Sequence, residues 1–168
     1  MSMDLYLGGC AQGKLRYVLQ KYRDQKAEIA DGNAEICREA DRSVLEDRID
    51  SCLIWNHFHI YVRSMLQSRL PKNLSDLSLR EQEDWEEAFL DLCWGRILDL
   101  EGTCRKLLVI SDLAGNGIVP LDAGDRIYRD MLGRLQVRLA ARADHVELIT
   151  AGLGQVLKNG AGNDSLDD

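Results

Sequence analysis

The chain has 168 residues, of which 45% are hydrophobic and 29% charged, a composition typical of one globular domain with a substantial core. Its formal net charge of −7 argues against general binding to nucleic acid or anionic membranes, because both need a basic surface. The start, MSMDLYLGGC, does not resemble a signal peptide, and no apolar run approaches the roughly 20 residues of a membrane helix. We therefore expect a cytoplasmic protein without nucleic-acid or membrane partners.

Apolar spacing predicts alternating strands and helices in the first half of the chain. The predicted strands are residues 5–7, 26–30 and 51–55, and the predicted helices are residues 14–23, 34–49 and 57–70. Pro71 follows the last of these helices and is expected to end it.

The second half continues the alternation. Ser78 and Glu81 have the spacing of a capping box and open the longest predicted helix, which we expect to end at Gly102. KLLVIS, residues 106–111, is the clearest strand, and Asp112 follows it directly. A helix over residues 123–143 and a final strand over residues 145–150 complete the pattern.

This order predicts an α/β fold of the P-loop NTPase type, with a mainly parallel sheet flanked by helices in a single domain. We expect the domain to span residues 1–158. Residues 159–168 are glycine-rich and acidic without apolar periodicity, which predicts a disordered tail.

A glycine loop lies between the first predicted strand and its helix. Residues 8–14, GGCAQGK, match G-x-x-x-x-G-K, in which backbone amides and the lysine surround phosphate oxygens at a helix N-terminus. The hydroxyl residue that normally follows the lysine and binds Mg²⁺ is replaced by Leu15. An ordinary glycine-rich turn is the alternative interpretation. The predicted nucleotide-binding residues are Gly8, Gly9, Cys10, Ala11, Gln12, Gly13, Lys14 and Leu15.

Asp112 stands at the carboxyl end of the best strand, where ligands of parallel α/β sheets gather. It is the predicted metal ligand, and Lys14 and Asp112 are the predicted catalytic residues. The alternative is that Asp112 only begins a turn, which Asp favours in any protein.

The stretch from Leu108 to Lys158 resembles the C-terminal third of the bifunctional adenosylcobinamide kinase / adenosylcobinamide-phosphate guanylyltransferase family. Its motifs are G-x-G-I-V-P, a helix with R-D-x-x-G-R, and A-D-x-V. The matching residues are Gly115, Gly117, Ile118, Val119, Pro120, Arg129, Asp130, Gly133, Arg134, Leu139, Ala140, Ala143, Asp144 and Val146. The family's N-terminal G-G-x-x-S-G-K-S aligns with the loop at residues 8–15.

The resemblance implies a P-loop domain, often trimeric, that functions in cobalamin biosynthesis. Such enzymes phosphorylate the aminopropanol hydroxyl of cobinamide with ATP or GTP and Mg²⁺, and then transfer GMP through a guanylyl-histidine. The ligands it implies here are a nucleotide and a corrinoid, and the implied assembly is a homo-oligomer.

The chain departs from the family at specific positions. Gln12 and Leu15 replace two loop serines, and Trp55 or Asn56 stands where the family has an acid at the end of its middle strand. Gln136 replaces an asparagine. Residues 31–50, the region that should bear the guanylylated histidine, contain no histidine, and a phosphoramidate requires an imidazole nitrogen.

His57 and His59 have three possible roles: a metal pair, a replacement nucleophile at His57, or a polar helix start at the pocket rim. The third is preferred, because a helix places the two side chains about 200° apart. The helix over residues 123–143 also has a stripe of arginines, of which Arg134 and Arg138 could face a phosphate or a neighbouring subunit. A solvated face is the preferred interpretation.

Two functional hypotheses follow. In the first, the chain is a nucleotide-binding cobinamide kinase-like enzyme that lacks guanylyl transfer. In the second, it is a catalytically degenerate relative that binds a nucleotide or corrinoid, or serves as a partner subunit. Loss of the loop hydroxyl, the strand acid and the histidine together favours the second, because phosphoryl transfer depends on a positioned metal.

Overall fold

The structure is a computed structural model that describes residues 1–32, 51–71, 76–115 and 122–160. Its strands are β1 (Ser2–Gly8), β2 (Ala27–Asp31), β3 (Cys52–Asn56), β4 (Lys106–Asp112), β5 (His145–Thr150) and β6 (Leu153–Asn159). Its helices are α1 (Lys14–Lys21), α3 (Phe58–Arg69), α4 (Leu79–Thr103) and α5 (Ala123–Arg142).

The six strands form one sheet in the order β2-β3-β4-β1-β5-β6. β1 lies in the middle and pairs in parallel with both β4 and β5, while β6 pairs antiparallel with β5 at one edge. The nearly continuous burial of β1, β3 and β4 is that of strands covered on both faces of a sheet. The mainly parallel α/β sheet predicted from the sequence is therefore confirmed.

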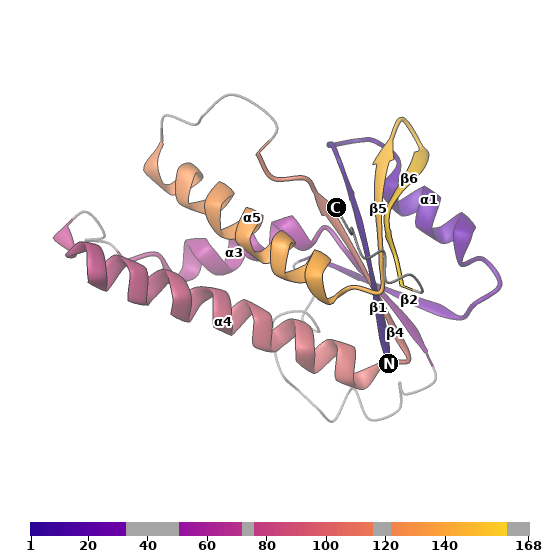
Figure 1. Ribbon diagram of the computed structural model, residues 1–168, viewed down its shortest axis with the longest axis horizontal. Coiled ribbons are helices and arrows are strands. Elements are labelled where there is room, and N and C mark those ends of the chain that lie inside the picture. Colours follow the sequence, from indigo (N-terminus) through magenta and orange to yellow (C-terminus); the bar gives the residue numbers. More distant parts are fainter. Residues whose placement is uncertain (33–50, 72–75, 116–121, 161–168) are drawn as a thin grey trace, which may run out of the picture.

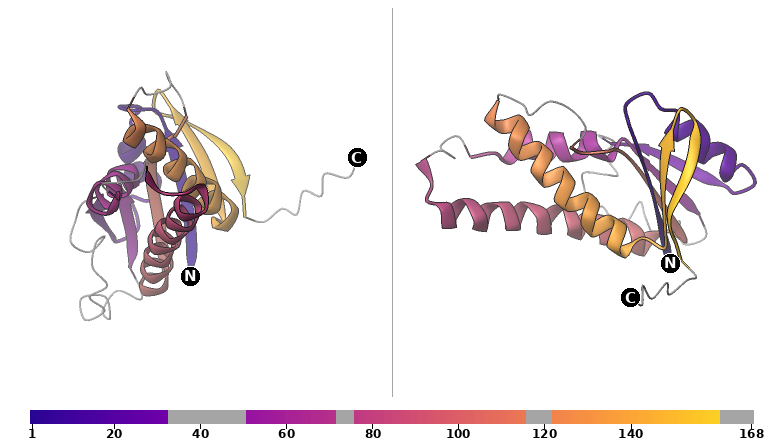
Figure 2. Two further views of the ribbon diagram at one scale, coloured as in Figure 1. Left: turned by 90° about the vertical axis from the view of Figure 1, so that its left-hand side faces the viewer. Right: turned by 45° about the horizontal axis from the view of Figure 1, so that its top comes forward.

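Helices cover the two faces of the sheet unequally. In Figures 1 and 2, α1 lies on one face, and α3, α4 and α5 lie on the other. The larger core lies beneath these three helices and includes Trp55, Phe89 and Leu135. The smaller core lies beneath α1 and includes Tyr6, Val18 and Ile110.

The predicted elements within the described ranges are all present, with local corrections. β1 extends from Ser2 to Gly8, well beyond the predicted residues 5–7. α4 continues through Gly102 to Thr103, so Gly102 does not end the helix. The strand β6 was missed, because its apolar residues are exposed and give no core signal. Leu19 in α1 and Leu92 in α4 are apolar but exposed, at 39% and 43%.

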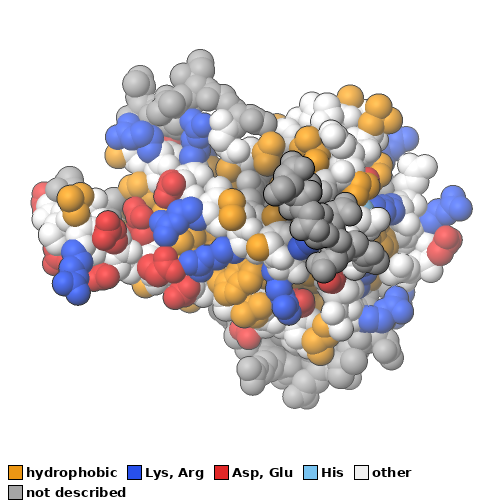
Figure 3. Space-filling model, viewed as in Figure 1, with side chains coloured by type: hydrophobic (Ala, Val, Ile, Leu, Met, Phe, Trp, Pro, Cys, Tyr) orange, Lys and Arg blue, Asp and Glu red, His pale blue; other side chains and the backbone are white. Residues whose placement is uncertain are grey.

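The arginine stripe of α5 lies on a partly solvated face, as predicted, and part of it pairs with the acidic side of α4. Arg134 contacts Glu86 and Glu87 at 3.0 and 3.1 Å, and Arg138 contacts Glu87 and Asp91. Blue and red side chains accordingly intermingle where the two helices meet in Figure 3. These partly exposed pairs fix how the long helix α4 lies against α5, and each contributes little energy alone.

Three predictions lie outside the described residues: the helix over residues 34–49, the loop residues 117–120, and residues 161–168 of the predicted tail. Residue 159, where the tail was expected to begin, is the last residue of β6. Within the described ranges, no helix combines the length and the apolarity needed to cross a membrane.

Candidate functional site

The glycine loop joins the carboxyl end of β1 to the N-terminus of α1, as its sequence predicts. Gly13 is the residue before the helix and has φ of 79°, a left-handed conformation that glycine adopts without strain. The first turn of α1 contains no acidic residue, so nothing there competes with a bound anion for the free amides. The loop therefore has the backbone form of an anion-binding helix start.

Lys14 is bent back beneath this loop and is only 7% exposed. Its ammonium donates to the carbonyl oxygens of Gly9 at 2.6 Å and Gly8 at 3.4 Å. It also forms an ion pair with Asp112 Oδ1 at 2.6 Å. Its three protons are thus directed at acceptors of the protein itself, and a phosphate that approaches Lys14 must compete with them.

Asp112 reaches the loop because β4 lies beside β1, with Asp112 directly opposite Gly8. Its backbone amide donates to Nδ1 of His59 at 3.1 Å, so this nitrogen is unprotonated and the ring proton lies on Nε2. Nε2 is 3.6 Å from Oδ2 of Asp112. Burial lowers the pKa of His59, and nearby Asp112 offsets this only in part, which favours the neutral ring.

Gln136 holds the same strand end from α5. Its amide nitrogen donates to the backbone oxygen of Asp112 at 2.6 Å and to the hydroxyl of Ser111 at 3.0 Å. Its amide oxygen accepts from the backbone N–H of Ala114 at 3.0 Å. Gln136 therefore has a clear structural role at the position where the family has an asparagine.

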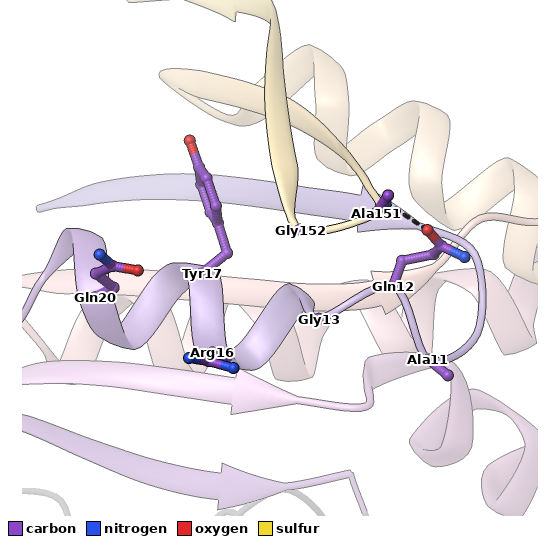
Figure 4. Close-up of a pocket in the computed structure, with 8 residues that line it drawn as sticks. All are labelled: Ala11, Gln12, Gly13, Arg16, Tyr17, Gln20, Ala151 and Gly152. Atoms are coloured by element: carbon purple, nitrogen blue, oxygen red, sulfur yellow. Dashed lines mark hydrogen bonds between the residues drawn. The ribbon is translucent and has the colours of Figure 1, made fainter.

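The two residues that replace the loop serines face different surroundings. Gln12 accepts hydrogen bonds from the turn between β5 and β6: its side chain from Ala151 N–H at 2.5 Å, and its backbone oxygen from Gly152 N–H at 2.9 Å (Figure 4). Leu15 is half-buried and packs against the smaller core. Gln12 thus bonds the loop to the β5–β6 turn. Leu15 gives a packing contact at the position where a serine could have bound a metal.

Two cavities adjoin the loop. One, of about 350 Å³, lies over the carboxyl ends of β3 and β4 and is lined by Cys10, Lys14, Asn56, His57 and Asp112, among others. The other, of about 400 Å³, lies between α1 and the β5–β6 turn. Figure 4 shows the second cavity, with Tyr17 extending from α1 along the β5–β6 hairpin, where its hydroxyl donates to Glu147, and Arg16 on the opposite side of α1.

The structure separates Trp55 from Asn56, which the sequence left as alternatives. Trp55 is fully buried in the larger core against Phe58 and Tyr61. Asn56 lines the cavity of about 350 Å³ and is 5% exposed. Asn56 is therefore the residue at the carboxyl end of β3 that faces the candidate site.

His57 lies next along the chain, at the rim of that cavity. Its Nδ1 is 2.7 Å from Oδ1 of Asp31, the last residue of β2, and 3.1 Å from the amide nitrogen of Asn56. Burial raises the pKa of Asp31, but hydrogen bonds from His57 and from the Gly32 amide outweigh it, and the net pKa is lowered. Asp31 is thus an ionised partner for the imidazole.

The side chains present offer Mg²⁺ a sparse set of ligands. Asp112 is the carboxylate next to the loop, and it is paired with Lys14, while Leu15 has no oxygen to contribute. Among the described residues, no three His, Cys, Asp or Glu side chains are grouped as a metal site. Mg²⁺ often binds through one carboxylate with phosphate oxygens and water, so the residues fit such a metal only together with a bound nucleotide.

Lys14 and Asp112 were predicted from the sequence, and the structure brings them into contact; Asp31 and the hydrogen bonds of His59 and Gln136 were not predicted. Asp31 had a usable signal, since it ends a predicted strand just as Asp112 does. The contacts of His59 and Gln136 join distant parts of the chain and leave no local pattern.

Comparison with known proteins agrees with the resemblance. Residues 39–157 match the model of the family described as cobinamide kinase / cobinamide phosphate guanyltransferase, a range that begins after the glycine loop. The bifunctional adenosylcobalamin biosynthesis protein CobU of Salmonella typhimurium is 42% identical over 87 residues, which cover 46% of each chain. The protein of the same name from Escherichia coli K12 is 30% identical over 84 residues, or 47% of this chain and 46% of the relative. The chain thus spans about half the length of these curated relatives. Because the family model matches most of its length, the chain belongs to the cobinamide kinase / cobinamide phosphate guanyltransferase family.

Proposed function

We propose that this chain binds ATP or GTP at the Gly8–Leu15 loop and acts as a cobinamide kinase-like protein of cobalamin biosynthesis that lacks guanylyl transfer. The observation that supports this best is the buried ammonium of Lys14, which lies beneath free helix amides and beside Asp112. The family description and the names of the relatives supply the substrate, cobinamide, and the pathway.

Phosphate binding follows from the loop geometry. The amides at the start of α1 donate to phosphate oxygens, and Lys14 exchanges its carbonyl acceptors in the loop for the outer phosphates. The cavity beside Gln12 and Tyr17 suits the base and ribose, because it adjoins the loop and is open enough to admit them. Asp112 is the carboxylate that would hold Mg²⁺ beside the bound phosphates.

Other parts of the proposal come from the family: a corrinoid is the second ligand, and the chain assembles as a homo-oligomer, a trimer by family resemblance. The proposed domain limits, residues 1–158, are those that the sequence pattern predicts. A cytoplasmic location agrees with biosynthesis of a soluble cofactor from a charged nucleotide.

A catalytically degenerate role is the second candidate, and one contact favours it. The ion pair between Lys14 and Asp112 gives each charged group a partner within the protein, as a loop with a purely structural role would require. Phosphoryl transfer to cobinamide, measured with ATP and with GTP, distinguishes the two roles. Turnover supports the kinase, and nucleotide binding without turnover supports the degenerate relative.

Restoring the hydroxyl should strengthen Mg²⁺-dependent binding. We expect Leu15→Ser to tighten ATP or GTP binding by roughly 1–3 kcal/mol when Mg²⁺ is present, the scale of one recovered charge-assisted contact. The wild-type chain should show weak Mg²⁺ dependence. Calorimetric titrations with Mg²⁺ and with a chelator measure both.

Leu15→Ala is the matched control, because it removes the same packing against the smaller core without adding an oxygen. Equal affinities of the Ser and Ala variants would show that the loop does not position a metal. A tight, strongly Mg²⁺-dependent complex of the wild type would contradict the sparse ligand set.

Guanylyl transfer should be absent. Incubation with radiolabelled GTP is expected to leave no acid-labile, base-stable nucleotide on the protein, since residues 31–50 contain no histidine. Autoradiography after separation under alkaline conditions measures this. A label that disappears in a His57 variant would refute the prediction and identify a replacement nucleophile.

A further inference from the structure

Pairing of β2 with β3 builds a histidine–aspartate pair at the carboxyl edge of the sheet. The register places Asp31 opposite Asn56, and His57 follows at once. A carboxylate can only accept a hydrogen bond, and its 2.7 Å contact with Nδ1 is shorter than the 3.1 Å contact from the Asn56 amide. Nδ1 therefore carries the ring proton, and Nε2 keeps a free lone pair.

The backbone around this pair is unusual in two ways. His57 has φ of 55°, a left-handed conformation uncommon outside glycine and typical of constrained sites. Gly32, which follows Asp31, approaches so closely that a Cβ at this position would overlap the carbonyl oxygen of His57. The same carbonyl accepts from the amide of Ile60 at 2.8 Å and begins α3. The position of His57 is thus fixed from both β2 and α3.

The pair belongs to the cavity that also contains the loop lysine. His57, Lys14 and Asp112 all line the cavity of about 350 Å³. The ring of His59 lies near both His57 and Asp112: its centroid is 5.6 Å from that of His57, and its Nε2 is 3.6 Å from Asp112. Because His59 is already a hydrogen-bond acceptor at Nδ1, His57 is the histidine in this cavity that keeps a free basic nitrogen among the described contacts.

We propose that His57, oriented by Asp31, is the general base that deprotonates the acceptor hydroxyl in phosphoryl transfer. This inference rests on the proposed kinase function. Nε2 takes the hydroxyl proton while the acceptor oxygen bonds to the γ-phosphorus. The bond from that phosphorus to its bridging oxygen breaks, and the nucleoside diphosphate leaves with the electron pair. The proton passes from His57 to water after the products leave.

Two variants test this role without disturbing the left-handed backbone at His57. Asparagine and glycine both tolerate a positive φ, so His57→Asn and His57→Gly should keep the backbone while removing the base. We expect kcat for cobinamide phosphorylation to fall about 100-fold or more in both variants. Nucleotide affinity, measured by calorimetry, should change less than about twofold, since Lys14 and the loop supply the phosphate contacts.

Added imidazole should restore turnover to His57→Gly, whose missing side chain leaves room for it, and Asp31→Asn should lose part of the rate through the wrong tautomer. His145→Asn, the same substitution at the other end of the sheet, is the control and should retain wild-type kcat. A histidine that only begins α3 would give no imidazole rescue.

Three results would overturn the inference: wild-type kcat in the His57 variants, no rescue by imidazole, or a wild-type chain that binds nucleotide without transferring phosphate. The last result leaves nucleotide binding intact. A wild-type chain that binds neither ATP nor GTP would refute the proposed function itself, and the base with it.

Discussion

Replacing Lys14 with alanine should weaken ATP or GTP binding by about 100-fold, which corresponds to about 2.7 kcal/mol. The Lys14 side chain is 7% exposed and its ammonium is already held within hydrogen-bonding distance of the loop, so it meets a phosphate without a large loss of side-chain freedom. Charge-assisted hydrogen bonds of this kind contribute roughly 1.5–3 kcal/mol each. Isothermal titration of the full chain with each nucleotide measures the loss.

Lys21→Ala is the matched control for this result. Lys21 lies at the other end of α1 and pairs with Glu147, away from the loop. Its removal should lower the free energy of unfolding slightly and leave nucleotide affinity unchanged. If Lys14→Ala and the wild type bound nucleotide equally well, the loop at residues 8–15 would be only a turn.

Replacing Trp55 with alanine should reduce the free energy of unfolding by about 3–5 kcal/mol, the usual cost of deleting a large buried aromatic side chain. Trp55 is fully buried and packs edge-on against Phe58 and Tyr61, with ring centroids 5.0 and 4.9 Å away. The cavity left behind lies beneath α3, which the rest of the core holds in place. Urea denaturation followed by circular dichroism measures the change.

Trp55→Phe separates packing from polarity. The indole N–H of Trp55 has no hydrogen-bond partner among the described residues, so phenylalanine removes an unsatisfied donor as well as some volume. Its cost should therefore be much smaller than that of alanine. A Trp55→Ala variant with wild-type stability and lost nucleotide binding would instead place Trp55 in the site.

The kinase role and the degenerate, binding-only role need different residues at the carboxyl ends of the strands. Lys14 and Asp112 are paired with each other, so a phosphate that contacts Lys14 competes with Asp112 for its protons. The pair of His57 and Asp31 faces no such competition, because the proton of Nδ1 is already held by the carboxylate. A degenerate relative would need only the first pair, whereas a kinase makes use of both.

The sequence by itself determined the order of the described strands and helices as far as β5, the capped start of α4 and the glycine loop, because these depend on residues close together in the chain. Ser78 and Glu81 are three residues apart and form the predicted capping box. The run KLLVIS placed Asp112 at a strand end without knowledge of the strand's neighbours. The family resemblance likewise rested on contiguous motifs.

Tertiary structure alone decided which side chains meet at the carboxyl ends of the strands. Successive residues of a strand point to opposite faces, so a shift of one residue reverses them. The sequence therefore could not tell that Trp55 enters the core and that Asn56 lines the cavity. The contacts of Lys14 with Asp112, Asp31 with His57 and Asp112 with His59 span 98, 26 and 53 residues. Such pairs are set by the strand order β2-β3-β4-β1, which brings distant carboxyl ends together, and local periodicity does not encode that order.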